Sequence, residues 1–100
     1  MECSVEISMY PLNADYIPPI ITFIKRLRKH PFITAETNGM STQVFGDYQR
    51  VMNAINTEMK NTFTEEGKVV FNLKVLHGNL AKNLDAVSYT HLTLPTILLV

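Results

Sequence analysis

A run of hydroxyl and carboxylate side chains near the start of the chain is the pattern most capable of chemistry. In residues 3–11 every second side chain is polar, and the polar set is Ser4, Glu6, Ser8 and Tyr10. Successive side chains of a strand point to opposite faces of a sheet, so these groups share one face, opposite an apolar set that belongs to the core. The polar face indicates either a solvated surface or a pocket for a small polar ligand.

Arrangements of residues typical of catalysis or metal binding do not occur at recognisable spacings. His30 and His77 lie in different predicted connections, so neither a Ser-His-acid nor a Cys-His pairing can be proposed. Cys3 is the one cysteine of the chain, which excludes an internal disulfide and a cysteine-cluster metal site. The four glycines are isolated rather than gathered in a phosphate-binding loop. We therefore expect a protein that is not an enzyme and that needs neither a metal nor a cofactor.

The size and composition of the chain fit a single globular domain. Its 100 residues are 46% hydrophobic, which is enough to bury one core. The net charge of zero argues against nucleic-acid binding through phosphate neutralisation. The N-terminus lacks the segments of a signal peptide, and the longest apolar runs are too short to span a bilayer. We expect a cytoplasmic protein without membrane insertion.

Two helices are predicted from apolar residues at helical spacing. The first is capped by Asp15, has two prolines in its first turn, and stops at the sequence His30-Pro31. Its apolar residues are Ile20, Phe23, Ile24 and Leu27, and the basic residues on its other side, within 25–29, indicate a solvated face. The second helix is capped by Asp47, ends before a polar turn at 64–67, and has its apolar residues at Val51, Ala54, Ile55 and Met59.

Three further strands are predicted from alternating patterns at 32–37, 40–45 and 68–76. The sequence Asn38-Gly39 between the first two is a strong hairpin signal, because both residue types tolerate positive φ. The element order is then β-α-β-β-α-β. Two right-handed crossovers joined by a hairpin predict an α+β ferredoxin-like sandwich, with a four-stranded antiparallel sheet in the order 4-1-3-2 and two helices on one face.

This topology leaves the second face of the sheet, the open face, without a covering layer. The residues predicted on it are Glu6, Ser8, Tyr10, Ser41, Gln43, Phe45, Asn72 and Lys74. Exposed aromatic rings of Tyr10 and Phe45 would favour a partner, so we expect a homodimer or homotetramer formed through this face or through a strand edge.

The end of the sequence does not continue the pattern. Residues 87–96 match the translation of a transposase adapter used in sequencing libraries, and they show no capping or periodicity that links them to the fold. We therefore expect a ferredoxin-like ligand-binding domain over residues 1–86 with a truncated C-terminus, and a non-native tail over residues 87–100.

Two segments together resemble a known family. Residues 5–12, Val-Glu-Ile-Ser-Met-Tyr-Pro-Leu, and residues 37–46, Thr-Asn-Gly-Met-Ser-Thr-Gln-Val-Phe-Gly, are similar to the YkoF-type family of thiamin/hydroxymethylpyrimidine-binding proteins. The resemblance extends over nearly all of residues 2–80. It implies a ferredoxin-like domain, used in tandem or as a dimer, that binds thiamin or its pyrimidine moiety without chemistry, in salvage or transport of the vitamin.

The resemblance also indicates where the ligand would bind. The matching positions are Ser8, Tyr10, Pro11, Thr37, Ser41 and Thr42, whereas Asn38 and Gly39 replace residues that tend to be acidic in two-domain relatives. An aminopyrimidine needs paired donors and acceptors together with a flat neighbour, for which the rings of Tyr10 and Phe45 are candidates. The predicted ligand-binding set is Glu6, Ser8, Tyr10, Thr37, Asn38, Ser41, Thr42 and Phe45.

Two other functions are compatible with the same fold. A small regulatory or sensing module would recruit a protein partner through the open face of the sheet. A cofactor-free enzyme of the dimeric ferredoxin-like kind would place a histidine or an acid in a deep cavity, and the absence of a histidine from the predicted open face counts against it.

Overall fold

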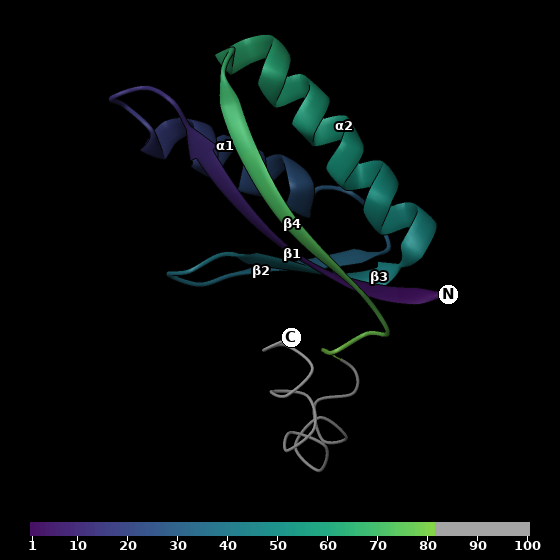
Figure 1. Ribbon diagram of the computed structural model, residues 1–100. Coiled ribbons are helices and arrows are strands. Elements are labelled where there is room, and N and C mark those ends of the chain that lie inside the picture. Colours follow the sequence, from purple (N-terminus) through teal and green to yellow (C-terminus); the bar gives the residue numbers. More distant parts are fainter. Residues whose placement is uncertain (82–100) are drawn as a thin grey trace.

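The computed structural model describes residues 1–81, which form four strands and two helices in the order β-α-β-β-α-β (Figure 1). The elements are β1 (Glu2–Pro11), α1 (Ile17–Arg28), β2 (Ile33–Thr37), β3 (Thr42–Asp47), α2 (Tyr48–Glu66) and β4 (Val69–His77). The strands form one antiparallel sheet in the order β2-β3-β1-β4. This is the predicted ferredoxin-like α+β fold, with β1 in the interior of the sheet as expected.

The core lies between the sheet and both helices. It is built from the apolar face of β1 and the apolar stripes of the helices, namely Cys3, Val5, Ile7, Phe23, Leu27, Val44, Val51, Ala54 and Ile55. Both helices therefore cover the same face of the sheet. Burial is the main reason that the pKa of the Cys3 thiol is raised above its ordinary value, because a thiolate would lose its hydration there.

The first helix begins without a side-chain cap. Its N-cap residue is Tyr16, and no side chain there accepts a hydrogen bond, so the predicted cap at Asp15 is wrong. Pro18 and Pro19 fall in the first turn, as predicted. A capping side chain would accept hydrogen bonds from N–H groups of this turn, and proline has no N–H to donate.

The second helix is capped as predicted but is longer. The Asp47 carboxylate accepts a hydrogen bond from the Arg50 N–H at 3.2 Å, and this bond is the main cause of a lowered pKa of Asp47. The predicted polar turn at 64–67 is wrong, since α2 continues to Glu66. It ends at Gly67, whose positive φ of 78° suits a residue without a Cβ.

The hairpin between β2 and β3 has a different centre from the predicted one. The innermost residues are Gly39 and Met40, enclosed by Asn38 and Ser41, and β3 starts at Thr42 rather than at residue 40. Neither Asn38 nor Gly39 has a positive φ. The Asn38 Oδ1 atom instead accepts hydrogen bonds from the N–H groups of Met40 at 2.8 Å and Ser41 at 3.2 Å, so a side chain takes over bonds that the strand would otherwise make.

The open face is less exposed at one end than predicted. Phe45 is only 8% exposed, so its predicted exposure is wrong. Its neighbour in the register is Ser4, whose hydroxyl donates to the Gly78 carbonyl at 2.7 Å and accepts from the Leu80 N–H at 2.9 Å. The chain after β4 therefore folds back onto this end of the sheet, a long-range contact that alternation alone does not reveal.

The predicted domain boundary at residue 86 and the predicted foreign tail at 87–100 lie outside the described residues. Within residues 1–81, no helix is long and apolar enough to cross a membrane.

The packing of α1 gives a first prediction. Replacing fully buried Leu27 (Leu27→Ala) should lower the free energy of unfolding by about 2–5 kcal/mol, because it removes apolar contacts and leaves a cavity. Urea denaturation followed by circular dichroism measures this. The matched control is Ile21→Ala on the same helix, where the side chain is exposed and the loss should be much smaller. Equal losses would contradict the described packing.

The cap of α2 gives a second prediction, on pH dependence. Because the pKa of Asp47 is lower in the folded state than its ordinary value of 3.8, its ionised form stabilises the fold above that pH, and this contribution is lost as the pH falls through the folded pKa. Urea denaturation over a pH series should show Asp47→Asn less sensitive to acid than the unchanged chain. Parallel pH profiles would contradict the assigned role.

Candidate ligand-binding site

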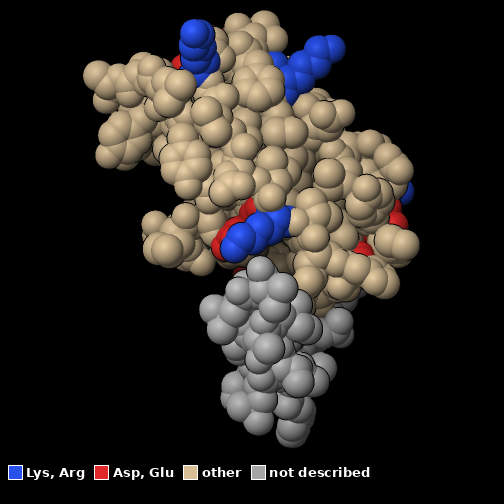
Figure 2. All heavy atoms as spheres, in the orientation of Figure 1, with Lys and Arg blue, Asp and Glu red and all other residues tan. Residues whose placement is uncertain are grey.

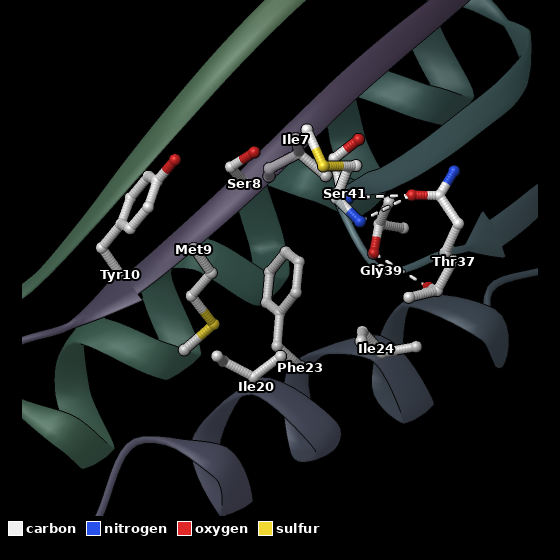
Figure 3. A pocket seen from close by; sticks show the side chains of 13 residues that line it. Ile7, Ser8, Met9, Tyr10, Ile20, Phe23, Ile24, Thr37, Gly39 and Ser41 are labelled. Atoms are coloured by element: carbon white, nitrogen blue, oxygen red, sulfur yellow. Dashed lines mark hydrogen bonds between the residues drawn. The ribbon is translucent and has the colours of Figure 1, made fainter. Parts of the chain in front are cut away.

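A cavity of about 190 Å³ opens at the end of the sheet where β2 stops and β3 begins (Figure 3). The pairing of β1 with β3 ends at Ile7↔Thr42, whereas its pairing with β4 continues to Pro11↔Val69. The last residues of β1 therefore have a strand on one side only. The cavity is enclosed by this part of β1, by α1 and by the β2–β3 turn, through Ile7, Ser8, Met9, Tyr10, Ile20, Phe23, Ile24, Thr37, Asn38, Gly39, Met40, Ser41 and Thr42.

One wall of the cavity is apolar and comes mainly from α1. Ile20, Phe23 and Ile24 are spaced so that they share one face of the helix, and Met9 points toward them from β1 (Figure 3). The Phe23 ring is 3% exposed and packs against the Phe71 ring with 5.0 Å between the centroids. A fixed aromatic ring beside an adaptable thioether suits the face of a flat ligand.

The opposite wall is polar and comes from the β2–β3 turn. The hydroxyl oxygens of Thr37 and Thr42 lie 2.9 Å apart and share a hydrogen bond, so one of the two hydroxyl hydrogens is left for a further acceptor. The side-chain Oδ1 atom of Asn38 already accepts from two turn amides, and its Nδ2 donates to Gln43 Oε1 at 3.4 Å. The threonine pair is therefore the better placed side-chain group for a ligand.

Glu6 supports this wall from the open face without lining the cavity. Its carboxylate accepts from the Ser41 hydroxyl at 2.9 Å and pairs with Lys74 Nζ at 3.6 Å. The Ser41 hydroxyl also accepts from Gln43 Nε2 at 2.8 Å. The carboxylate is thus partnered on both oxygens, and its role in this geometry is to hold Ser41 and the turn in place.

The structure brings together most of the predicted ligand-binding set. Six of the eight predicted residues line the cavity, namely Ser8, Tyr10, Thr37, Asn38, Ser41 and Thr42. Glu6 reaches it only through Ser41, and Phe45 lies away from it, beside Ser4. The cavity also extends to the helix side of β1, whereas the sequence pattern indicated the open face. Ser8 and Tyr10 point away from Met9 and the α1 residues, so they form its rim (Figure 3).

The apolar lining residues were missed because their spacing is the same as that of core residues. Met9 continues the alternation of β1, and Ile20, Phe23 and Ile24 repeat the helical period. A signal was nevertheless present: the alternating run that became β1 is longer than the run that became β3, so one end of an interior strand had to lack a neighbour.

The lining of the cavity suits an uncharged group, because it consists of apolar side chains, hydroxyls and one side-chain amide. Among residues 1–81, no charged side chain lines the cavity, and Tyr10 is the one lining side chain with a common titratable group. No group of three or more His, Cys, Asp or Glu residues within 1–81 is arranged to hold a metal ion.

A second concavity is lined by polar side chains that bond one another across α1 and α2. His30 Nε2 lies 2.6 Å from Glu58 Oε2, a carboxylate that is almost fully buried, and Arg26 pairs with Glu65 at 2.7 Å. The Arg28 guanidinium donates to the Ala35 carbonyl at 3.3 Å. These contacts tie α1 to its neighbours, so part of the basic face that was predicted to be only solvated is engaged within the domain.

No family model and no curated protein matches the chain, but solved structures do. The hypothetical protein MJ1052 of Methanocaldococcus jannascii is 22% identical with a TM-score of 0.73, over 87% of this chain and 96% of that one. Protein SP2199 of Streptococcus pneumoniae is 19% identical with a TM-score of 0.74, over 88% and 99%. TM0486 of Thermotoga maritima, provisionally described as a thiamine biosynthesis/salvage protein, is 15% identical with a TM-score of 0.75, over 89% and 99%. At these identities the likeness shows a shared fold.

Proposed function

We propose that this chain binds thiamin or its hydroxymethylpyrimidine moiety without catalysing a reaction, in salvage or transport of the vitamin in the cytoplasm. The observation that carries the proposal is one cavity that combines an apolar wall around Phe23 with the hydroxyl pair of Thr37 and Thr42. Both segments that resemble the thiamin-binding family, residues 5–12 and 37–46, contribute to its lining. The provisional description of TM0486 points to the same vitamin.

The size and charge of the cavity favour the pyrimidine over the thiazolium ring. Its volume of about 190 Å³ is below the range of about 300–1,000 Å³ typical of sites for drug-sized ligands. One ring fits such a space better than two. The uncharged lining gives no compensation for burying the thiazolium cation, so that ring belongs outside, near the Tyr10 rim.

The absence of chemistry is part of the proposal. The lining residues from the described part of the chain include no histidine, carboxylate, cysteine or lysine to act as a nucleophile or general base near neutral pH. Such a cavity can hold and orient a ring, but it offers no group to transfer a proton at physiological pH.

Calorimetric titration tests the proposed function. Hydroxymethylpyrimidine and thiamin should both bind saturably, and the isolated thiazole alcohol should not, because recognition lies on the pyrimidine. The sample is the folded chain, checked by circular dichroism. Heat from neither pyrimidine compound would contradict the proposal and favour a module that recruits a protein partner.

Filling the cavity should weaken binding without unfolding the protein. Ile24→Phe adds a ring to the α1 wall, so the dissociation constant for hydroxymethylpyrimidine should rise at least tenfold, about 1.4 kcal/mol. The matched control is Ile21→Phe, three residues earlier on the same helix, where the side chain is exposed and does not line the cavity. Unchanged affinity in Ile24→Phe would place the ligand elsewhere.

We further propose that the chain forms a homo-oligomer through the edge strand β4. This strand is nine residues long and has half-exposed Val70 and Val75, and within residues 1–81 it pairs with β1 alone. An open edge of this length is a template for pairing with a second copy, and antiparallel pairing of two identical edges closes with two-fold symmetry. In the view where β4 crosses the middle of the molecule, few charged side chains are seen (Figure 2).

A charge on this edge should separate the copies. Val75→Lys places like charges close together across a symmetric pair of β4 strands, so light scattering coupled to size exclusion should show a shift from dimer or tetramer to monomer. Leu12→Lys, at an exposed position after β1, is the matched control and should leave the assembly unchanged. A monomeric unchanged chain, or a Val75→Lys variant that stays assembled, would contradict this interface.

A further inference from the structure

We infer that the main chain of Met9 binds the polar edge of the ligand. Its N–H donates to a ring nitrogen, and its C=O accepts from the exocyclic amine beside that nitrogen. The inference rests on the proposed function and deepens it, because it names the edge of the heterocycle that is recognised. It follows from three steps, which concern the direction of the Met9 main chain, the loss of its strand partner, and the match to the ligand.

The direction of the Met9 main-chain groups follows from bonds at both ends of β1. The Gly78 N–H donates to the Glu2 carbonyl at 2.9 Å, and the Leu12 N–H donates to the Lys68 carbonyl at 3.2 Å. The even-numbered residues of β1 therefore face β4. In an antiparallel strand the N–H and C=O of one residue point to the same side and alternate along the chain, so the odd-numbered residues, Met9 included, face the β3 side.

The β3 side confirms this alternation. The Tyr48 N–H, which follows β3, donates to the carbonyl of Met1, an odd-numbered residue, at 2.7 Å. The register Ile7↔Thr42 belongs to the same series. Two independent neighbours thus give the same direction for the Met9 groups.

Among the strands that the structure describes, none pairs with Met9 on the β3 side, because the β2–β3 turn bends away before it reaches Met9. Continuing the β1–β3 register by two residues beyond Ile7↔Thr42 would place Met40 opposite Met9. The Met40 N–H instead donates to Asn38 Oδ1 at 2.8 Å, and the pairing stops at Thr42. The Met9 N–H and C=O consequently face the cavity that Met9 lines.

The edge of the ligand must offer an acceptor to the Met9 N–H and a donor to the Met9 C=O. A residue in extended conformation presents N–H and C=O side by side, and the complementary edge is an acceptor next to a donor. In hydroxymethylpyrimidine this edge is formed by N3 and the 4-amino group. The apolar wall of Phe23 and Ile24 reduces competition from water, so a ligand without the amine would leave the Met9 carbonyl unpaired at a cost in affinity.

Amide hydrogen exchange measured by NMR on the full chain tests the inference. In the free protein the Met9 amide should exchange much faster than the Ile7 amide, which pairs with β3, and the Tyr10 amide, which pairs with β4. Saturation with hydroxymethylpyrimidine should slow Met9 exchange at least tenfold and leave the two control amides nearly unchanged. The 4-deamino analogue should bind at least tenfold more weakly.

Each other outcome overturns the inference in a distinguishable way. Binding that leaves Met9 exchange unchanged, or equal affinity for the deamino analogue, would remove the Met9 main chain from recognition while the proposed function stands. Slow Met9 exchange in the free protein would show that the amide is already paired. Absence of hydroxymethylpyrimidine binding would overturn the proposed function and this inference together.

Discussion

The contact on which the candidate site depends is the capture of two main-chain amides by the side chain of Asn38. By accepting from Met40, the Asn38 Oδ1 atom satisfies the N–H group that an extending strand would offer to β1, and its second bond, from the Ser41 N–H, holds the turn in this shape. The hairpin therefore turns away from β1, and β3 begins only at Thr42, whereas β1 continues beside β4 to Pro11. A complete ladder at this point would place the turn where the cavity now opens.

The helix α1 serves the core and the cavity with one apolar stripe. Leu27 is fully buried, whereas Ile20 and Ile24, near the free end of β1, line the cavity. Phe23 does both, since its ring is held by Phe71 and borders the cavity. The wall that would meet a ligand is thus fixed by packing, which lowers the entropy cost of binding.

Most of the fold could be predicted because each element follows a simple local rule. Alternation over residues 3–11 and the 3.6-residue period in both helices gave the correct element order and sheet order. Element ends were less predictable because they depend on details of individual residues. Asp15 could not act as a cap once prolines had removed the amides, and Asn38 formed a side-chain-bonded turn in place of one with positive φ.

The candidate site was predicted only in part, because a periodic pattern does not distinguish an apolar lining residue from a core residue. Its polar residues stood out in the sequence, and six of them meet around the cavity. Its apolar residues did not, since Met9 and Phe23 follow the same periods as the core. Ser4, the register neighbour of buried Phe45, binds a segment more than seventy positions away in the chain, and no local pattern encodes that contact.

In this account the late start of β3, at Thr42, creates a ring-binding cavity between β1 and α1. A crystal structure of the chain grown with hydroxymethylpyrimidine tests it most directly. We expect density for the ring between Met9 and the Phe23–Ile24 wall, with its amino edge toward β1. Density on the open face of the sheet, beside Glu6 and Lys74, would contradict the account.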